Sequence, residues 1–282
     1  MDTGLLKAFL EVQRTRHFGR AAANLFLSQS TVSARIRQLE EELGTHLFIR
    51  QRKHIELTPA GRKFLAFAEN MINTWNRAQQ QISVPEGMQS LLAIAALPSL
   101  WDAFLEDWLR QLPSLLPELA LRADAGDTDS LLRQLQEGTL DLALLFDPPE
   151  TARFQLRELA PLPLVLVSTQ AGQTSHEALR TGYVLVDWGT SFAGLHARRF
   201  PDLPAPRLRV SVGRLALGYI LENGGAAYLP EPMVRGELGR RLFPVEDTPI
   251  IRKETYAVYA RPTDRGDVIE QVIDSLPFGR TY

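Results

Sequence analysis

Between residues 28 and 37 the sequence places hydroxyl, amide and guanidinium groups along one side of a predicted helix. At about 100° per residue, Ser30 and Arg37 point away from the apolar stripe of this helix, and Gln29 lies on one shoulder of the polar face. These groups suit the major groove of DNA, because glutamine bonds to the edge of adenine, arginine to the edge of guanine, and hydroxyl groups to bases or phosphates. The predicted DNA contacts, including those on neighbouring elements, are Arg20, Ser28, Gln29, Ser30, Thr31, Ser33, Arg35, Arg37, Arg50, Arg52 and Lys53.

Apolar residues around this polar face predict two helices that cross closely. Along the second helix they recur at spacings of four, three and four: Val32, Ile36, Leu39 and Leu43. Residues 18–25 supply a complementary inward face with small alanines, and Ser28 can cap the second helix by accepting a backbone N–H. The pattern is typical of a helix-turn-helix. It equally suits an ordinary amphipathic helix pair whose polar side is only solvated.

A hairpin with a basic tip is predicted directly after the helix pair. Residues 47–49 and 55–57 are short apolar segments, and the residues between them are basic or polar. A wing of this kind lies against phosphates or enters a minor groove. Thr58 and Pro59 then start a further helix, with threonine as the cap and proline at the first helical position.

The helix predicted over residues 59–82 has a heptad pattern. Its apolar positions follow spacings of four, three, four, three and four: Phe64, Ala68, Met71, Trp75, Ala78 and Ile82. We interpret this seam as the contact with the same helix of a second subunit, so that two heads related by a two-fold axis read an inverted repeat. Packing of the seam inside its own domain is the alternative.

Charge divides the chain at the end of this helix. Residues 1–81 hold 12 Lys and Arg against 7 Asp and Glu, whereas residues 82–282 hold 19 against 26. The overall charge of −2 therefore hides a basic N-terminal part. Because its basic residues coincide with the predicted helix pair and wing, double-stranded DNA is the expected partner.

Five sequence motifs resemble the DNA-binding head and linker helix of LysR-type transcriptional regulators. They are F-x-R-A-A-x-x-L at residues 18–25, S-Q-S-x-V-S at 28–33, I-R-x-L-E at 36–40, L-G-x-x-L-F-x-R at 43–50 and L-T-x-A-G at 57–61. Most members have Ser or Thr at the position of Gly19, which predicts a weaker cap for the first motif helix. Many have Arg and then Gln at the positions of Ala34 and Arg35, so one predicted contact moves around the helix by one position.

The remainder of the chain predicts an α/β domain. Strand-like and helix-like segments alternate from residue 91, which indicates βαβ units and a parallel sheet. This pattern is similar to the two-lobed effector domain of the same family, which resembles type 2 periplasmic binding proteins. The expected organisation is a winged helix-turn-helix over residues 1–58, a linker helix over 59–82, a hinge over 83–90, and an effector domain over 91–282 with one lobe at about 91–162 and 262–282 and another at about 163–261.

The resemblance implies a small-molecule effector in the cleft between the lobes. The expected effector contacts are Pro98, Ser99, Thr128, Trp188, Thr190 and Phe192. Ser99 would cap a helix whose N-terminus favours an anion. Two alternatives stay open: Ser99 and Thr128 as simple helix caps, with Trp188 as a packing residue, and a cleft that is vestigial in a regulator without a ligand.

Residues 14–20, 99–101 and 187–189 are similar to one branch of the family, whose representative represses the flagellar master operon. The resemblance further implies a homodimer or homotetramer and allows contact with RNA polymerase.

Other functional classes have little support in the sequence. The G-T-S-F-A-G segment at residues 189–194 lacks the spacing of a nucleophile elbow, the five histidines lack metal-ligand spacing, and no Gly-rich phosphate loop is present, so no enzyme, metal or cofactor is expected. The absence of cysteine excludes disulfides and thiolate sites. No signal peptide or membrane-spanning run is recognised, and a cytoplasmic protein is expected rather than an exported solute-binding protein.

Overall fold

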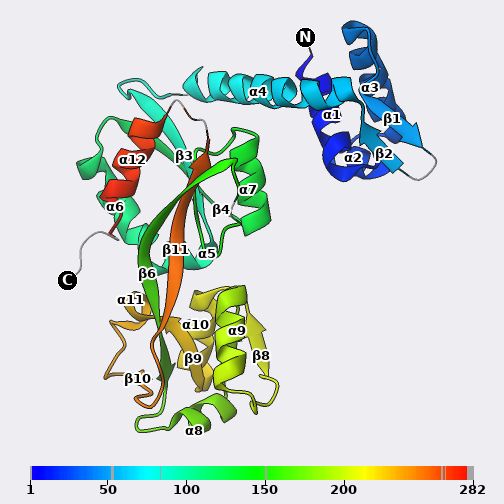
Figure 1. Ribbon diagram of the computed structural model, residues 1–282. Coiled ribbons are helices and arrows are strands. Elements are labelled where there is room, and N and C mark those ends of the chain that lie inside the picture. The colour runs from blue at the N-terminus through cyan, green and yellow to red at the C-terminus, as the bar shows by residue number, and fades with distance from the viewer. Residues whose placement is uncertain are drawn as a thin grey trace. The chain divides into compact units, whose positions relative to one another are not determined.

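The computed structural model describes residues 2–51, 54–82, 84–149, 151–261, 263 and 265–277. The chain forms two compact units, one built from residues 1–83 with 136–139 and the other from residues 84–135 and 140–282 (Figure 1). The elements of the N-terminal unit follow in the order α1 (Thr3–Thr15), α2 (Phe18–Asn24), α3 (Gln29–Leu43), β1 (Phe48–Gln51), β2 (His54–Leu57) and α4 (Pro59–Ile82).

The core of the N-terminal unit joins its helices to its hairpin. The ring of Phe9 in α1 is fully buried and lies 5.3 Å from the ring of Phe48 in β1 and 5.2 Å from that of Phe64 in α4, measured between centroids. Such tilted and edge-on pairs add to the free energy of apolar burial. One aromatic cluster therefore positions the wing and the first turns of α4 against the helix pair.

The predicted apolar stripe of α3 is confirmed except at its end. Val32, Ile36 and Leu39 are buried, but Leu43 is 42% exposed, so its placement in the core was wrong. The helix stops at Leu43 because Gly44 turns the chain in the left-handed region with φ 64°. Leu47, three residues beyond this turn, is fully buried instead.

Side chains cap the starts of all four helices described in this unit, and Asp2 Oδ1 caps α1 by accepting from Gly4 N at 2.7 Å. Ser28 Oγ accepts a hydrogen bond from Thr31 N at 3.1 Å, and Thr58 Oγ1 accepts one from Gly61 N at 2.9 Å, which confirms both predicted caps. The weak cap expected at Gly19 was wrong. The first motif helix begins at Phe18, and His17, two residues before Gly19, provides its cap.

A buried carboxylate holds the start of the wing. Glu40 Oε1 accepts hydrogen bonds from Leu47 N at 2.8 Å and from Phe48 N at 3.2 Å, and the residue is buried. Thr58 Oγ1 donates to His46 O at 2.7 Å on the other side of the same segment. A Cβ atom at Gly61 would lie only 2.2 Å from Leu47 O, so this position needs glycine. Glu40 and Gly61, which end two of the family-like motifs, thus hold the wing against α3 and α4.

The second unit is a two-lobed α/β structure. Its first elements are β3 (Ser90–Ala96), α5 (Pro98–Leu100), the π-helical turn η1 (Trp101–Leu105), α6 (Glu106–Leu115), β4 (Leu119–Ala125), α7 (Thr128–Gln136), β5 (Leu142–Leu145) and β6 (Phe154–Ser168). The later elements are α8 (Ser175–Arg180), β7 (Val184–Val186), α9 (Thr190–Arg199), β8 (Leu208–Val210), α10 (Gly213–Asn223), β9 (Ala226–Pro230), α11 (Glu231–Val234), β10 (Phe243–Pro244), β11 (Ile251–Ala260) and α12 (Gly266–Ser275).

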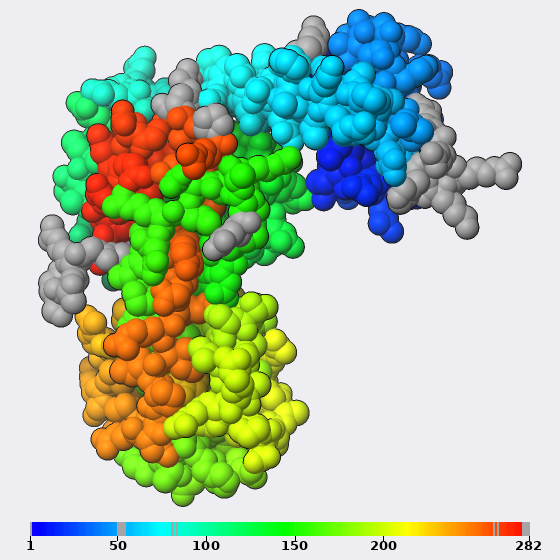
Figure 2. Space-filling model, viewed as in Figure 1, coloured from blue at the N-terminus to red at the C-terminus, as the bar shows by residue number. Residues whose placement is uncertain are grey.

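Two long antiparallel strands connect the lobes. The main sheet has the order β10-β6-β11-β5-β3-β4, and β9 also pairs with β6. The expected parallel βαβ arrangement is confirmed for β3 with β4 and for β3 with β5. Figure 1 shows β6 and β11 running together from one lobe into the other, and Figure 2 shows them as a green and orange band between the two masses. Residues 256–258 pair with β5, so β11 enters the first lobe earlier than residue 261, where the sequence pattern had placed this boundary.

Several elements of this unit differ from the sequence pattern. The helical segment after β3 begins at Pro98, and β6 begins at Phe154, eight residues before the lobe boundary expected at about residue 162. In the first part of β6 the alternation of polar and apolar residues is broken by the adjacent Arg157 and Glu158, and Pro161 follows, which weakens the strand signal. Among the described residues, no helix combines the length and apolarity needed to cross a membrane.

We predict that Glu40→Ala loosens the wing. The change leaves two backbone donors without their charged acceptor, which typically costs about 1.5–3 kcal/mol per bond to a charged group. Hydrogen–deuterium exchange should accelerate in peptides that cover residues 44–58, and the midpoint of urea denaturation should fall. Glu41→Ala, an exposed change on the same helix, is the control and should alter neither measurement. Equal exchange in both variants would contradict the role of Glu40.

Candidate nucleic-acid interface

The polar face of α3 is accessible in the N-terminal unit. Gln29, Ser30 and Arg37 are exposed, and Ser33 is half-buried beside them. The buried stripe of the same helix holds it against α1 and α2. A helix fixed by one face and free on the other has the geometry of a recognition helix that enters a major groove.

The hydroxyl groups at the start of α3 form a small network. Ser28 Oγ lies 2.7 Å from Ser30 Oγ and 2.8 Å from Thr31 Oγ1. Each of these hydroxyls keeps acceptor capacity after one such bond. The network positions the first turn of the helix and leaves Ser30 exposed at its surface.

The predicted arginine contacts have different surroundings. Arg20 on α2 is exposed. Arg35 is half-buried, and its Cζ atom would lie 3.2 Å from a Cβ atom built at Gly4, so its side chain packs over the start of α1. Arg50 is described by its backbone, which pairs with Ile55 across the hairpin. Arg52 and Lys53 lie outside the described residues, and their predicted contacts stay predictions.

The heptad seam of α4 divides into two parts. Ala68 is fully buried and Phe64 is partly buried in the core of the N-terminal unit, so the first part of the seam packs within its own domain. Ile82 is 86% exposed, and Trp75 and Ala78 are exposed as well. The seam residues in the first half of α4 thus pack inside their own domain. Only those in the second half are available for a partner helix.

An apolar groove follows the exposed half of the helix. It has a volume of about 600 Å³. Its lining residues are Asp2, Thr3, Leu6, Phe67, Asn70, Met71, Thr74, Trp75 and Ala78. Phe67 is 66% exposed and was missed in the sequence pattern. It belongs to a second series with spacings of four, three and four, through Met71, Thr74 and Ala78, which could have revealed it.

Three of the expected effector contacts lie in the core of the second unit. Trp188 is 1% exposed and donates from Nε1 to Tyr228 O at 3.0 Å, and Ser99 and Phe192 are also buried. This burial favours a packing role for the three residues, and their ligand contacts stay predictions. The packing interpretation of Trp188 is confirmed.

The other expected contacts lie at helix starts. Pro98 and Thr190 are exposed and Thr128 is half-buried. Neither Ser99 nor Thr128 is a helix cap: Leu97 holds the cap position of α5, and Asp127 Oδ1 accepts from Ser130 N at the start of α7.

The residues around Phe192 form an aromatic cluster in the second lobe. Tyr183 Oη lies 2.9 Å from His196 Nε2, and the two rings are stacked with centroids 5.6 Å apart. Burial lowers the pKa of His196 and raises the pKa of Tyr228 to about 12. Both shifts favour the uncharged forms, which fits a packing role for this cluster.

A buried lysine joins the two lobes where ligand contacts were expected. Lys253, in the crossing strand β11, is 1% exposed, and its ammonium group bonds to Asp147 Oδ2 and Ser191 Oγ. Asp147 follows β5 of the first lobe, and Ser191 lies in the first turn of α9 in the second lobe. Ser191 N also donates to Asp147 Oδ2 at 3.4 Å. The carboxylate therefore occupies a site formed by an ammonium group and a helix N-terminus.

A second set of ion pairs connects the lobes. Arg214 at the start of α10 donates to Asp102 Oδ1 and to Glu106 Oε1, both at 2.9 Å. These two carboxylates raise the pKa of Arg214. The lobes are thus linked by charged contacts in addition to the two crossing strands.

Two family models match the chain. The description "Bacterial regulatory helix-turn-helix protein, lysR family" covers residues 3–62, and "LysR substrate binding domain" covers residues 85–277. The chain belongs to the LysR family of bacterial transcriptional regulators. It is a DNA-binding transcriptional regulator and not an enzyme, and the resemblance seen in its motifs is confirmed.

Curated relatives support this membership over the whole chain. The HTH-type transcriptional regulators HdfR of Yersinia pestis (strain Pestoides F) and of Yersinia pseudotuberculosis serotype O:1b (strain IP 31758) are each 38% identical over 282 residues, which covers 97% of this chain and 95% of each relative. HdfR represents the branch that the three short segments had indicated.

Solved structures of LysR regulators share the fold. A full-length variant of OxyR from Pseudomonas aeruginosa has a TM-score of 0.61 at 20% identity and covers 98% of this chain and 94% of its own. Full-length CbnR complexed with its target DNA has a TM-score of 0.56 at 18% identity and covers 98% and 99%. The combination of a winged helix-turn-helix and a two-lobed α/β domain is therefore confirmed.

We predict that α3 carries sequence discrimination. Gln29→Ala or Ser33→Ala should reduce the preference for specific over random duplex by about 1–3 kcal/mol, because each removes a base contact. Arg20→Ala should weaken binding to both duplexes and lower the salt slope by about one unit. Fluorescence anisotropy at several salt concentrations measures both effects, and Gln111→Ala, exposed on α6, is the matched control. Unchanged discrimination in both α3 variants would show that α3 does not recognise the DNA sequence.

Proposed function

We propose that this LysR regulator binds an inverted-repeat operator as a dimer, with α3 of each subunit in a major groove. The exposed polar face of α3 on a buried, capped helix pair carries this proposal. Because the head is basic and the polar face of α3 is exposed, phosphate contacts can orient the unit while the α3 side chains read bases.

The second half of α4 supports the dimer. Its exposed apolar side chains, Phe67, Trp75 and Ile82, would remain in water in a single subunit. Apolar stripes on a long helix are typically buried against a partner helix. A two-fold arrangement of the groove would bury the same residues from both subunits and place the two heads for an inverted repeat.

For assembly, we expect Phe67→Glu with Trp75→Glu to shift the protein toward smaller species, because the change would bury charge in the partner interface. Both positions lie outside the core of the head, so the variant should keep its fold by circular dichroism. Sedimentation velocity measures the mass. Ala66→Glu, exposed on the same helix and not a groove residue, should keep the parent mass. A parent mass for the double variant as well would exclude this groove as the main contact.

For the effector domain, we propose that an anionic small molecule acts between the lobes by competing with Asp147 for Lys253. The ammonium group and the first turn of α9 form a site that suits a carboxylate, and an internal carboxylate occupies it. A ligand changes the balance between two states only if it binds them unequally. Displacement of Asp147 would uncouple one interlobe contact and thereby alter the lobe arrangement.

A second candidate is a regulator whose effector domain takes no ligand. The near-complete burial of Lys253 and the second set of ion pairs at Arg214 favour this candidate, since both hold the lobes together without any added molecule. Regulation would then follow the concentration of the protein alone.

The variant Asp147→Asn separates these candidates. It removes the internal carboxylate, so carboxylate metabolites screened by thermal shift on the full chain should raise its Tm more than that of the parent. Lys253→Met should abolish the response, because the ammonium group is lost. Asp187→Asn, which changes an exposed ion pair with Arg209, is the control. Absence of any response in Asp147→Asn would favour the candidate without a ligand.

A further inference from the structure

The imidazole of His17 caps α2 in a defined orientation. Its Nδ1 atom accepts hydrogen bonds from Gly19 N at 3.0 Å and from Arg20 N at 3.3 Å. These two groups belong to the unpaired backbone donors of the first helical turn, so the ring replaces the hydroxyl or carboxylate that usually satisfies them. The cap ties the ring to the start of the helix that precedes the reading helix.

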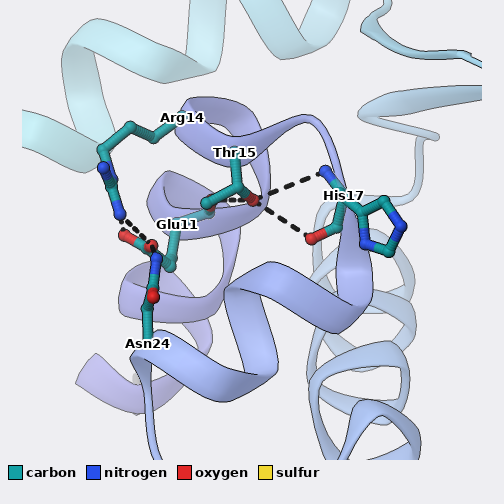
Figure 3. A network of polar contacts seen from close by, with 5 residues as sticks. All are labelled: Glu11, Arg14, Thr15, His17 and Asn24. Carbon is teal, nitrogen blue, oxygen red and sulfur yellow. Dashed lines mark hydrogen bonds and ion pairs between the residues drawn. The ribbon is translucent and has the colours of Figure 1, made fainter.

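The backbone of His17 is also held from the preceding helix. His17 N donates to Thr15 Oγ1 at 3.4 Å, and the same hydroxyl lies 2.8 Å from Glu11 O. Glu11 in turn accepts from Asn24 Nδ2 at 2.6 Å and bonds to Arg14. Figure 3 shows this network on one side, with the imidazole ring on the side away from Glu11 and Asn24. The backbone of His17 and the end of α2 are therefore both tied to α1.

The cap determines which ring nitrogen carries the proton. An imidazole that accepts hydrogen bonds at Nδ1 needs the lone pair there, so its hydrogen lies on Nε2. His17 is exposed. The Nε2–H group is thus a hydrogen-bond donor on an exposed side chain of the basic N-terminal unit.

Gly19 gives the ring its space beside the predicted base reader. A Cβ atom at this position would lie 3.1 Å from His17 Cε1 and 3.6 Å from Gln29 Oε1. Any larger residue would press on the ring, and it would also contact the amide. The absence of a side chain at Gly19 therefore lets the imidazole and the amide of Gln29 lie on two sides of one small gap.

We propose that His17 is a DNA contact residue, whose Nε2–H donates a hydrogen bond to a phosphate oxygen adjacent to the base pair that Gln29 reads. The inference rests on the proposed role of α3 for the position of the duplex. Neutral side-chain donors are common phosphate contacts in DNA complexes. The contact adds affinity without sequence preference, and it anchors the strand beside the reading side chain.

The test separates the cap from the donor. His17→Ser keeps an oxygen that can cap α2 but removes the ring donor, whereas His17→Ala removes both. With a short random-sequence duplex, His17→Ser should bind about three- to tenfold more weakly than the parent, the amount expected for one hydrogen bond, at an unchanged Tm. Its salt slope should also be unchanged, because a neutral donor releases no counterion. His17→Ala should lose the same affinity and several degrees of Tm.

Gly19→Ala provides a second, independent variant. Displacement of the ring should weaken binding to the same duplex. Because alanine favours the helix relative to glycine, the Tm should fall less than in His17→Ala. His176→Ser, an exposed change in the second unit, is the control. Parent affinity in His17→Ser would show that the ring is a cap only and would overturn the proposal. Failure of α3 as the reader would instead appear as unchanged discrimination in Gln29→Ala, which the random duplex does not measure.

Discussion

Unpaired backbone donors at the starts of helices are the constraint on which the DNA-binding unit depends. The first turn of each helix leaves N–H groups that need an acceptor. Ser28 supplies one for α3, Thr58 for α4 and the imidazole of His17 for α2. The caps of α2 and α3 lie where one helix follows another, and the cap of α4 lies between the hairpin and the helix, so each cap fixes where its helix begins. The exposed face of α3 is a consequence of this arrangement.

The linker helix shows how one repeating pattern serves two purposes. Its first turns complete the aromatic core around Phe9, where Phe64 meets the ring from the edge. Its last turns leave Trp75 and Ile82 in solvent. These exposed apolar side chains add nothing to the stability of the head, because burial energy requires that apolar surface be removed from water. The division between the halves explains how folding of the head and assembly can be coupled through one helix.

Internal charge pairing links the two lobes of the second unit. Burial of an ammonium group is costly unless it is paired and hydrogen-bonded, and Lys253 has both Asp147 and Ser191 as partners. These partners come from different lobes, so the stability of the buried charge depends on the lobes remaining together. Arg214 adds a more exposed link of the same kind, whose contribution is screened by solvent.

The sequence by itself determined the features that follow from local periodicity and from short-range capping. The buried stripe of α3, the caps at Ser28 and Thr58, the hairpin, the long α4 and the parallel βαβ order all arise from residues close together in the chain. The family could be recognised for the same reason, since its motifs are contiguous segments.

Tertiary structure alone decided which of the predicted side chains meet. In the sequence, Glu40 looks like any other polar residue of its helix. Only the fold brings the backbone N–H groups of Leu47 and Phe48 to its carboxylate. Lys253 and Asp147 are separated by 106 residues, and periodicity contains no information about contacts across such distances. Trp188 shows the same limit. Its position after a strand predicted a place in the cleft, but in the folded domain it is buried in the core. Long-range contacts of this kind depend on the relative positions of whole elements, and only the folded chain specifies those.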